Sequence, residues 1–203
     1  MIGAVSSNAQ VPSQESAPTS VTVTHEGPII RVERLEFAAG LSADGRVRPA
    51  MVRDVVRHPG AVTVIAVRDD GALVLVRNRR VAVDRWLIEF CAGKLERGED
   101  PAMAAGRELE EETGYSAQHL VKLGAFFTTP GFSDEIMHVF LATQLRPVAQ
   151  RLEPGEELEV VIMRQSELES AIASGAVSDG KTLGAYLLWT LQRSGGALGG
   201  DLS

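Results

Sequence analysis

β-Branched and aliphatic residues gather in short runs along the chain, and turn residues separate these runs. Turn signals rich in Asp and Gly lie at 42–45 and 69–71, between runs that have the length and composition of β-strands. The runs predict strands at 29–37, 48–56, 61–67, 72–78, 121–127, 136–143 and 158–163.

A helical segment interrupts the strands at 101–113. Asp100 is the residue type that caps a helix N-terminus, Pro101 suits the first helical position, and Gly114 suits the position just past the end. The segment therefore carries a start signal and a stop signal of its own.

Two further helices are predicted near the C-terminus. The first covers 166–173 and opens with a capping box of Ser166 and Glu169, and the second covers 179–192. Strands interspersed with helices predict an α/β domain whose helices pack against a mixed sheet.

The two ends of the chain differ in composition from its centre. Residues 1–27 are rich in Ser, Thr, Gln, Pro and Ala and predict a flexible N-terminal tail, because such residues bury too little apolar surface to offset the entropy of ordering. Residues 194–203 are rich in Gly and predict a flexible C-terminal tail. A single domain over 28–193 remains.

Composition excludes several classes of partner. The 203 residues include 20 basic and 27 acidic ones, so a net charge of −7 gives no support for binding to nucleic acid or to an anionic membrane. No apolar run approaches a spanning helix, and the first residues lack the pattern of a signal peptide. Cys91 is the only cysteine, which favours a reducing compartment. We expect a cytoplasmic protein.

Acidic residues concentrate around the first predicted helix. Residues 93–115 hold seven acidic and three basic residues, so more than half of the net charge lies in this stretch. At about 100° per residue, Glu108, Glu111 and Glu112 fall on one side of the helix, beside an apolar stripe that includes Leu109. One face of the helix is predicted to pack and its neighbour to present carboxylates.

These carboxylates predict a metal site or a solvated acidic face. Like charges three or four residues apart destabilise a helix by about 0.2–0.5 kcal/mol per pair, and a divalent cation reverses the sign of that interaction. Ligands that are all oxygen suit Mg²⁺ or Mn²⁺. Zinc is not indicated, because the four histidines are scattered and no cysteine cluster accompanies them.

Spacing decides between the two readings. Residues 93–115 match the pattern G-x5-E-x7-R-E-U-x-E-E-x-G-U, where U is a bulky apolar or aromatic residue. Seven fixed residues at ordinary usage, together with the two loose U positions, arise by chance in a chain of this length with a probability on the order of 10⁻⁷. The sequence here resembles the Nudix hydrolase family, and every fixed position of the family signature is filled.

The resemblance implies a fold, a reaction and a set of residues. The fold is an α/β/α sandwich, and the reaction is attack of water on the diphosphate of a nucleoside diphosphate linked to another group. By position, the implied metal ligands are Glu108, Glu111, Glu112 and the backbone carbonyl of Ala92. Arg107 and Glu99 match the residues that orient these carboxylates.

A second motif, TTPGFSDE at 128–135, lies between two predicted strands. On its own it predicts an ordinary exposed turn. Pro130 follows Gly114 by sixteen residues, and this spacing with Ser133 and Glu135 resembles the ADP-ribose pyrophosphatase branch of the family. The resemblance makes Glu135 the candidate general base or water-positioning residue.

Arginines cluster just before the acidic stretch, at positions 77, 79, 80 and 85. A planar guanidinium pairs well with diphosphate oxygens, although each arginine is equally compatible with a solvated loop. The segment resembles the family's Arg-rich strand end, which makes Arg80 the candidate phosphate contact, with Arg79 beside it and Glu89 as a nearby carboxylate. The match departs from the family where two residues separate Trp86 from Glu89 and where Cys91 replaces a common Pro.

Members of this branch are commonly homodimers built through N-terminal strands, so the resemblance implies a homodimer and dimerisation strands within 28–193.

The leading hypothesis is a Mg²⁺-dependent hydrolase, with Mn²⁺ as the other candidate ion, that cuts ADP-ribose to AMP and ribose 5-phosphate. The alternatives are the same chemistry on a UDP- or GDP-linked sugar, a non-catalytic ADP-ribose sensor, and an acidic interaction helix on an inert scaffold.

Overall fold

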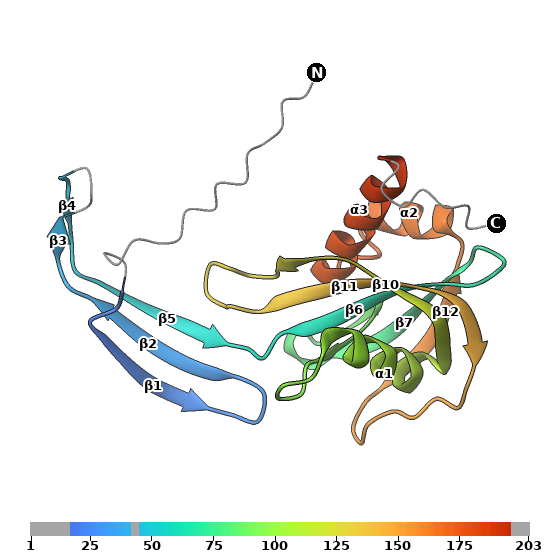
Figure 1. Cartoon of the computed structure of the whole chain (residues 1–203), viewed down its shortest axis with the longest axis horizontal. Coiled ribbons are helices and arrows are strands. Elements are labelled where there is room, and N and C mark those ends of the chain that lie inside the picture. The colour runs from blue at the N-terminus through green and yellow to red at the C-terminus, as the bar shows by residue number, and fades with distance from the viewer. Residues whose placement is uncertain (1–16, 42–44, 196–203) are drawn as a thin grey trace. The chain divides into compact units, whose positions relative to one another are not determined.

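The computed structural model of the chain describes residues 17–41 and 45–195. The chain divides into two compact units, with the boundary between Arg57 and His58. Figure 1 shows the order of the elements in both units. Among the described helices, none has the length and apolar character needed to cross a bilayer.

In its described residues the first unit consists of strands, and two of them match the N-terminal strands predicted at 29–37 and 48–56. Three of them form an antiparallel sheet in the order β1-β2-β5, and the other two form a small ladder. Their bounds are β1 (Ser20–Glu26), β2 (Arg31–Phe37), β3 (Gly40–Leu41), β4 (Val47–Arg48) and β5 (Met51–Arg57).

β1 lies inside the segment for which composition predicts a flexible tail, so that prediction is wrong for residues 20–26. Val and Thr alternate there, and β1 pairs with β2 so that Val21 lies opposite Leu35. The average composition of a long segment conceals a strand of seven residues. The predicted tail over residues 1–16 lies outside the described residues.

The second unit is built around one mixed sheet. Its main path runs β10-β11-β6-β7-β12, with β11 and β6 parallel and the other neighbours antiparallel, while β9 pairs with β6 and β8 with β7. The bounds are β6 (Ala61–Val67), β7 (Leu73–Arg80), β8 (Arg85–Glu89), β9 (Cys91–Lys94), β10 (Tyr115–Phe127), β11 (Ile136–Pro147) and β12 (Leu158–Met163). A 3-10 turn at Val81–Val83 joins β7 to β8.

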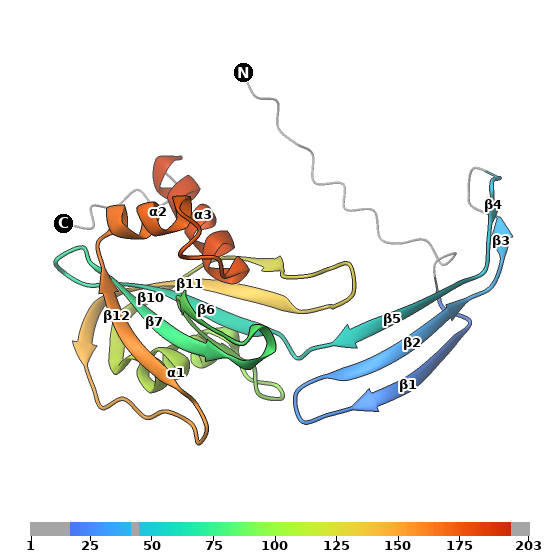
Figure 2. The same cartoon turned by 180° about the vertical axis from the view of Figure 1, so that it is seen from behind.

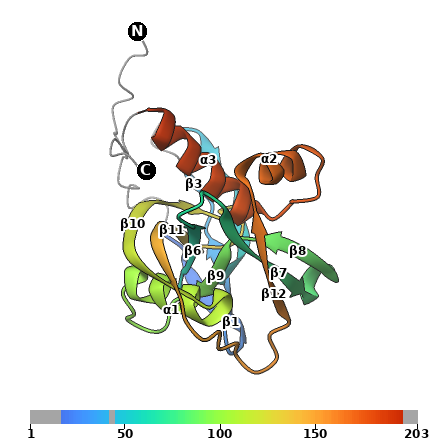
Figure 3. The same cartoon turned by 90° about the vertical axis from the view of Figure 1, so that its right-hand side faces the viewer.

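Helices cover both faces of this sheet. α1 (Pro101–Thr113) lies on one face, and α2 (Gln165–Ala173) and α3 (Gly180–Ser194) lie on the other (Figure 1, Figure 3). Figure 2 shows the same three layers from behind. Side chains alternate along β6, so Val64 packs in the cluster with α1 and Ile65 packs in the cluster with α2 and α3. The predicted α/β/α sandwich with a mixed sheet is confirmed.

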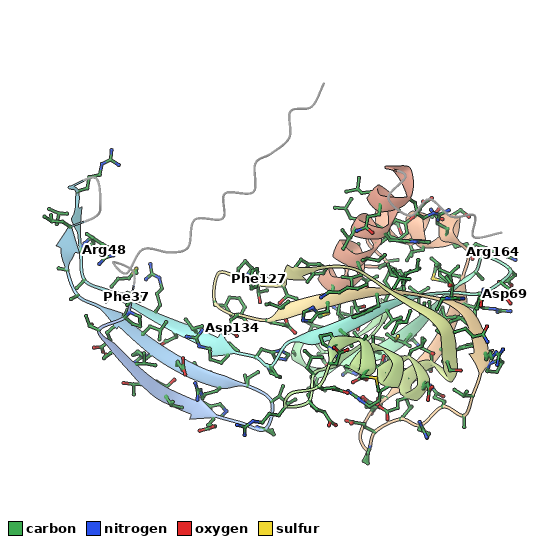
Figure 4. All side chains as sticks on the ribbon, in the orientation of Figure 1. Phe37, Arg48, Asp69, Phe127, Asp134 and Arg164 are labelled. Atoms are coloured by element: carbon green, nitrogen blue, oxygen red, sulfur yellow. The ribbon has the colours of Figure 1, made fainter. Side chains whose placement is uncertain are left out.

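The start of α2 differs from the prediction. The helix begins at Gln165, and Glu167, rather than Glu169, accepts the backbone N–H of the capping residue Arg164 at 2.6 Å. The guanidinium of Arg164 reaches the turn after β6, where Nη1 donates to the carbonyl of Asp70 at 2.6 Å; Figure 4 shows Arg164 beside this turn. The helix thus starts one residue earlier than predicted, and its capping residue also makes a tertiary contact.

The C-terminal boundary also shifts. The helix predicted at 179–192 is α3, which begins at Gly180 after its cap Asp179 and continues through Ser194, where the sequence predicts the start of a tail. Residues 196–203 of that predicted tail lie outside the described residues. β10 and β11 are longer than predicted, because they pair with each other over nearly their whole length.

Candidate functional site

α1 carries the acidic face, and local interactions fix both of its ends. The Asp100 carboxylate accepts the N–H of Ala102 at 2.8 Å, and Gly114 donates its own N–H to the carbonyl of Glu110 at 3.0 Å. Gly114 has φ 70°, a left-handed conformation that glycine adopts without steric cost. The predicted start and end of this helix are confirmed, so the positions of its glutamates follow from local sequence.

β9 brings backbone atoms against two of these glutamates. The N–H of Ala92 donates to Oε2 of Glu112 at 3.0 Å, and Glu112 is only 3% exposed. Gly93 lies even closer to Glu108, since a Cβ at position 93 would stand 1.9 Å from the Glu108 carboxylate. The glycine therefore makes room for a carboxylate beside the β9 backbone.

Arg107 links the acidic residues of the loop to those of the helix. Its Nε and Nη2 donate to the two oxygens of Glu99, both at 3.1 Å. Its Nη1 donates to Glu108 at 2.8 Å and to Glu111 at 3.1 Å. The structure thus brings together Arg107, Glu99 and two of the three predicted metal-binding carboxylates.

Burial changes the acidity of two helix carboxyls. Desolvation raises the pKa of Glu112 to about 8, with smaller contributions from Glu108 and Glu156, while the hydrogen bond from Ala92 lowers it. Desolvation also raises the pKa of Glu108, and Arg107 opposes that shift. Two carboxyls whose charged forms are disfavoured stand side by side, which is the electrostatic condition that a bound cation relieves.

The residues fit a divalent cation in their chemistry. The donors are carboxylate and carbonyl oxygens, which hard cations such as Mg²⁺ prefer. Among residues 17–41 and 45–195, no three His, Cys, Asp or Glu side chains gather in ligand geometry. Instead the Arg107 guanidinium engages Glu108 and Glu111 and supplies the compensating positive charge there.

A second cluster lies where β8 ends. Glu89 is 1% exposed and accepts Nε of Arg80 at 2.9 Å and Nη2 of Arg80 at 2.6 Å. Lys181 at the start of α3 donates Nζ to the same carboxylate at 2.5 Å. The structure therefore joins the predicted residues Arg80 and Glu89, and it adds a cation that the sequence analysis did not single out.

Arg79 does not belong to this cluster. Residues alternate between the two faces of β7, so Arg77 and Arg79 point away from the face that carries Arg80. Arg79 pairs with Asp84, and Arg77 pairs with Glu159 at 3.1 Å and lies 4.8 Å from the Trp86 ring centre. Strand periodicity was the signal that separates these arginines.

Glu135 is held within its own loop. Thr128 donates its hydroxyl to Oε2 of Glu135 at 2.5 Å, and Nδ1 of His58 lies 3.7 Å from Oε1. The neighbouring Asp134, labelled in Figure 4, accepts the backbone N–H of His58 at 2.9 Å. Within residues 45–195, no hydrogen bond or ion pair links Glu135 to a glutamate of α1.

The loop between β11 and β12 contacts the C-terminal end of α1. Gln150 donates Nε2 to the carbonyl of Glu112 at 2.6 Å, and Arg151 donates its N–H to the carbonyl of Glu111 at 3.0 Å. The charge of Glu156 in this loop contributes to the raised pKa values of Glu108 and Glu112. Sequence reasoning missed Glu156, since only the folded loop brings it into electrostatic range of α1.

Comparison with known proteins matches this arrangement to a family. The family model of the NUDIX domain matches residues 57–183. This range includes α1, β9, the loop that carries Glu135 and the loop that carries Glu156. The chain belongs to the NUDIX family. The family resemblance predicted from residues 93–115 is therefore confirmed.

Two similar proteins are described as pyrophosphatases, one of ADP-ribose and one of GDP-mannose. The chain is 47% identical over 146 residues to the ADP-ribose pyrophosphatase of Bacillus subtilis, an alignment that covers 70% of this chain and 77% of the relative. It is 36% identical over 164 residues to the GDP-mannose pyrophosphatase of Klebsiella pneumoniae, which covers 75% of this chain and 80% of that relative. The similarity is greater to the first than to the second.

A solved structure described as an ADP compounds hydrolase shares the fold. It superposes with a TM-score of 0.73 over 91% of this chain and 98% of the other, at 23% sequence identity. At that identity the likeness supports the fold alone.

Proposed function

We propose that this NUDIX chain is a Mg²⁺-dependent hydrolase that cleaves the diphosphate of ADP-ribose to AMP and ribose 5-phosphate. The observation that carries the proposal is the 47% identity to an ADP-ribose pyrophosphatase, in a chain that fills every fixed signature position. Mn²⁺ satisfies the same oxygen donors and is the other candidate ion.

Glu108, Glu111, Glu112 and the carbonyl of Ala92 are the proposed metal ligands. A bound divalent cation would neutralise charge on the phosphoryl oxygens and would lower the pKa of a bound water. Arg107, anchored by Glu99, would set the orientation of the carboxylates on α1. The catalytic residues proposed on α1 are therefore Arg107, Glu111 and Glu112.

Arg80 is the proposed contact of the protein with the diphosphate, because Glu89 fixes its guanidinium and the side chain is still 38% exposed. Arg79 remains a proposed substrate contact on the opposite face of β7.

In the reaction, the oxygen of water forms a bond to one phosphorus, and the bond from that phosphorus to the bridging oxygen breaks. A carboxylate takes the proton of the water.

Two loop carboxylates are candidates for that proton acceptor. Glu135 is the residue that sequence spacing favours, and Glu156 is the residue whose charge reaches Glu108 and Glu112. We expect Glu156→Gln to lower kcat by roughly 10²–10⁴ with little change in KM, and Glu135→Gln to have the smaller effect. Steady-state kinetics of the two variants checks this order. A larger loss in Glu135→Gln assigns the proton acceptor to Glu135.

An end-point assay tests the proposed function directly. Purified protein with Mg²⁺ is given ADP-ribose, GDP-mannose, UDP-glucose, NADH, diadenosine polyphosphates or 8-oxo-dGTP, and the products are separated by chromatography. We expect AMP chiefly from ADP-ribose, and we expect EDTA to suppress it. Cleavage of another compound in preference would overturn the substrate assignment.

A GDP-linked or UDP-linked sugar is the second candidate substrate, supported by the relatives that are GDP-mannose pyrophosphatases. The reaction is the same, since the signature sets the chemistry and the pocket walls set the choice of base and sugar. ADP-ribose that binds without being cleaved would instead identify a sensor.

We also propose a homodimer. On one face of the sheet of the first unit, Val21 is 53% exposed and Val23 is 47% exposed. A sheet of three strands needs an apolar face covered by another element to be stable. Size-exclusion chromatography with light scattering is expected to give twice the chain mass of 21.7 kDa, and a monomer would contradict the proposal.

Charge and cysteine content support the remaining expectations. A net charge of −7 opposes binding to nucleic acid or anionic membrane, and the single buried Cys91 supports a reducing, cytoplasmic location.

A further inference from the structure

Glu89 has two cationic partners, and the proposed function uses only one of them. Arg80 holds the carboxylate from β7 through two nitrogens, and Lys181 holds Oε2 from α3. The Glu89 side chain is 1% exposed and the Lys181 side chain 12% exposed. Such a buried cation requires an explanation, because burying Lys is costly unless the charge is paired.

Lys181 has a fixed position in the fold. Its Nζ also lies 2.9 Å from Oδ1 of Asp179, the residue that caps α3. The hydroxyl of Thr182 accepts the N–H of Phe90 at 3.0 Å, so the first turn of α3 is tied to the residue that follows Glu89. The lysine therefore approaches the carboxylate from a rigid support.

The charges of the cluster explain what a second cation does. One carboxylate paired with one guanidinium forms a neutral pair, which attracts an anion weakly. The two cations, Arg80 and Lys181, balance the two carboxylates, Glu89 and Asp179, and Asp179 lies 2.9 Å from Lys181. Without Lys181, the two carboxylates would outweigh the charge of Arg80, and the cluster would be negative next to an anionic ligand.

Arg80 has donors left for a ligand. Nε and Nη2 are bound to Glu89, and within the described part of the chain no hydrogen bond engages Nη1. A guanidinium that is fixed along one edge and free along the other suits recognition of an anionic oxygen.

We propose that Lys181 is a positioning residue for diphosphate binding: it shares the carboxylate of Glu89, so that Arg80 stays oriented and keeps its charge available to the ligand. The inference rests on the proposed function, because it takes the diphosphate of a nucleotide sugar as the anion that Arg80 meets. Lys181 acts through Glu89 and Arg80, without touching the substrate.

Kinetics of Lys181 variants with ADP-ribose and Mg²⁺ test the proposal. Lys181→Met is expected to raise KM about tenfold or more while kcat changes less than threefold, because ground-state binding of the anion weakens. Lys181→Arg keeps the charge and is expected to restore KM to within about threefold of the wild type. Arg193→Met removes one positive charge from the other end of α3 and serves as the matched control, with KM unchanged.

A double-mutant cycle separates this role from a purely structural one. In a Glu89→Gln background there is no carboxylate to share, so adding Lys181→Met is expected to leave KM unchanged. An effect of Lys181→Met that persists undiminished in that background would overturn the proposal. The double variant leaves no carboxylate at position 89, and Asp179 keeps its hydrogen bonds from Thr182 after it loses Lys181. Lys181→Gln, a neutral donor, replaces the Met variant if that variant unfolds.

Two outcomes distinguish this inference from the proposed function. A wild-type protein that does not cleave ADP-ribose rejects the proposed function, and the same variants are then compared by calorimetric binding of ADP. An active wild type whose KM is unchanged in Lys181→Met and Lys181→Gln rejects only the role of Lys181.

Discussion

Glu112→Gln is expected to lower turnover of ADP-ribose by a factor on the order of 10³ or more and to remove the response to Mg²⁺. The amide keeps the shape of the side chain, and its oxygen can still accept the N–H of Ala92, which donates to Glu112 at 3.0 Å in the wild type. Only the charge that would hold the cation is lost. Initial rates across a Mg²⁺ titration measure the effect.

Glu110→Gln is the matched control, since Glu110 lies on the same helix but at a variable signature position and pairs with Arg151 at 3.6 Å near the surface. We expect its activity to stay within about twofold of the wild type. Activity that survives in Glu112→Gln would refute the assignment of the metal site.

The same substitution is expected to change how the metal-free protein responds to pH. Burial raises the pKa of Glu112 from its ordinary value of 4.5 to about 8, so the folded state holds this proton more tightly than the unfolded state. The wild type in EDTA should therefore lose stability as pH rises from 4.5 to 8, whereas Glu112→Gln lacks this contribution. Melting temperatures of both proteins across that window measure the difference, and parallel curves would contradict it.

Gly93→Ala is expected to have the second largest effect, with activity lowered by roughly 10²-fold or more. The added Cβ would lie 1.9 Å from the Glu108 carboxylate, a separation that forces the carboxylate or β9 to move. Because β9 also carries Ala92, the same shift disturbs the contact with Glu112. Kinetics and the concentration of Mg²⁺ that gives half-maximal activity measure the loss.

Gly106→Ala provides the comparison for this variant. A Cβ at Gly106 meets no atom within 4 Å, and alanine is the better helix former by about 0.8–1.0 kcal/mol. We expect Gly106→Ala to keep its activity and to raise the melting temperature. Equal activity in Gly93→Ala and Gly106→Ala would show that the close approach of Gly93 to Glu108 has no functional importance.

The first helix and its chemistry were predictable because their causes are local. Asp100 and Gly114 fix the ends of α1, and helical periodicity then places Glu108, Glu111 and Glu112 on one side. Most strand cores were predictable for the same reason. β1 was not, because the average composition of residues 1–27 concealed a short strand that forms a hairpin with β2. The start of α2 was predicted one residue late.

The sequence by itself determined the family signature, the order of most elements and the oxygen-rich chemistry of α1. Only the tertiary structure brought Lys181 to Glu89 across 92 positions, set Gly93 against Glu108, and placed Glu156 within electrostatic range of the helix. The physical reason is that capping and periodicity act between neighbours in the chain. Charge pairing and close backbone approach depend instead on which strands and helices pack together. That packing is a property of the folded α/β/α sandwich and not of any single segment.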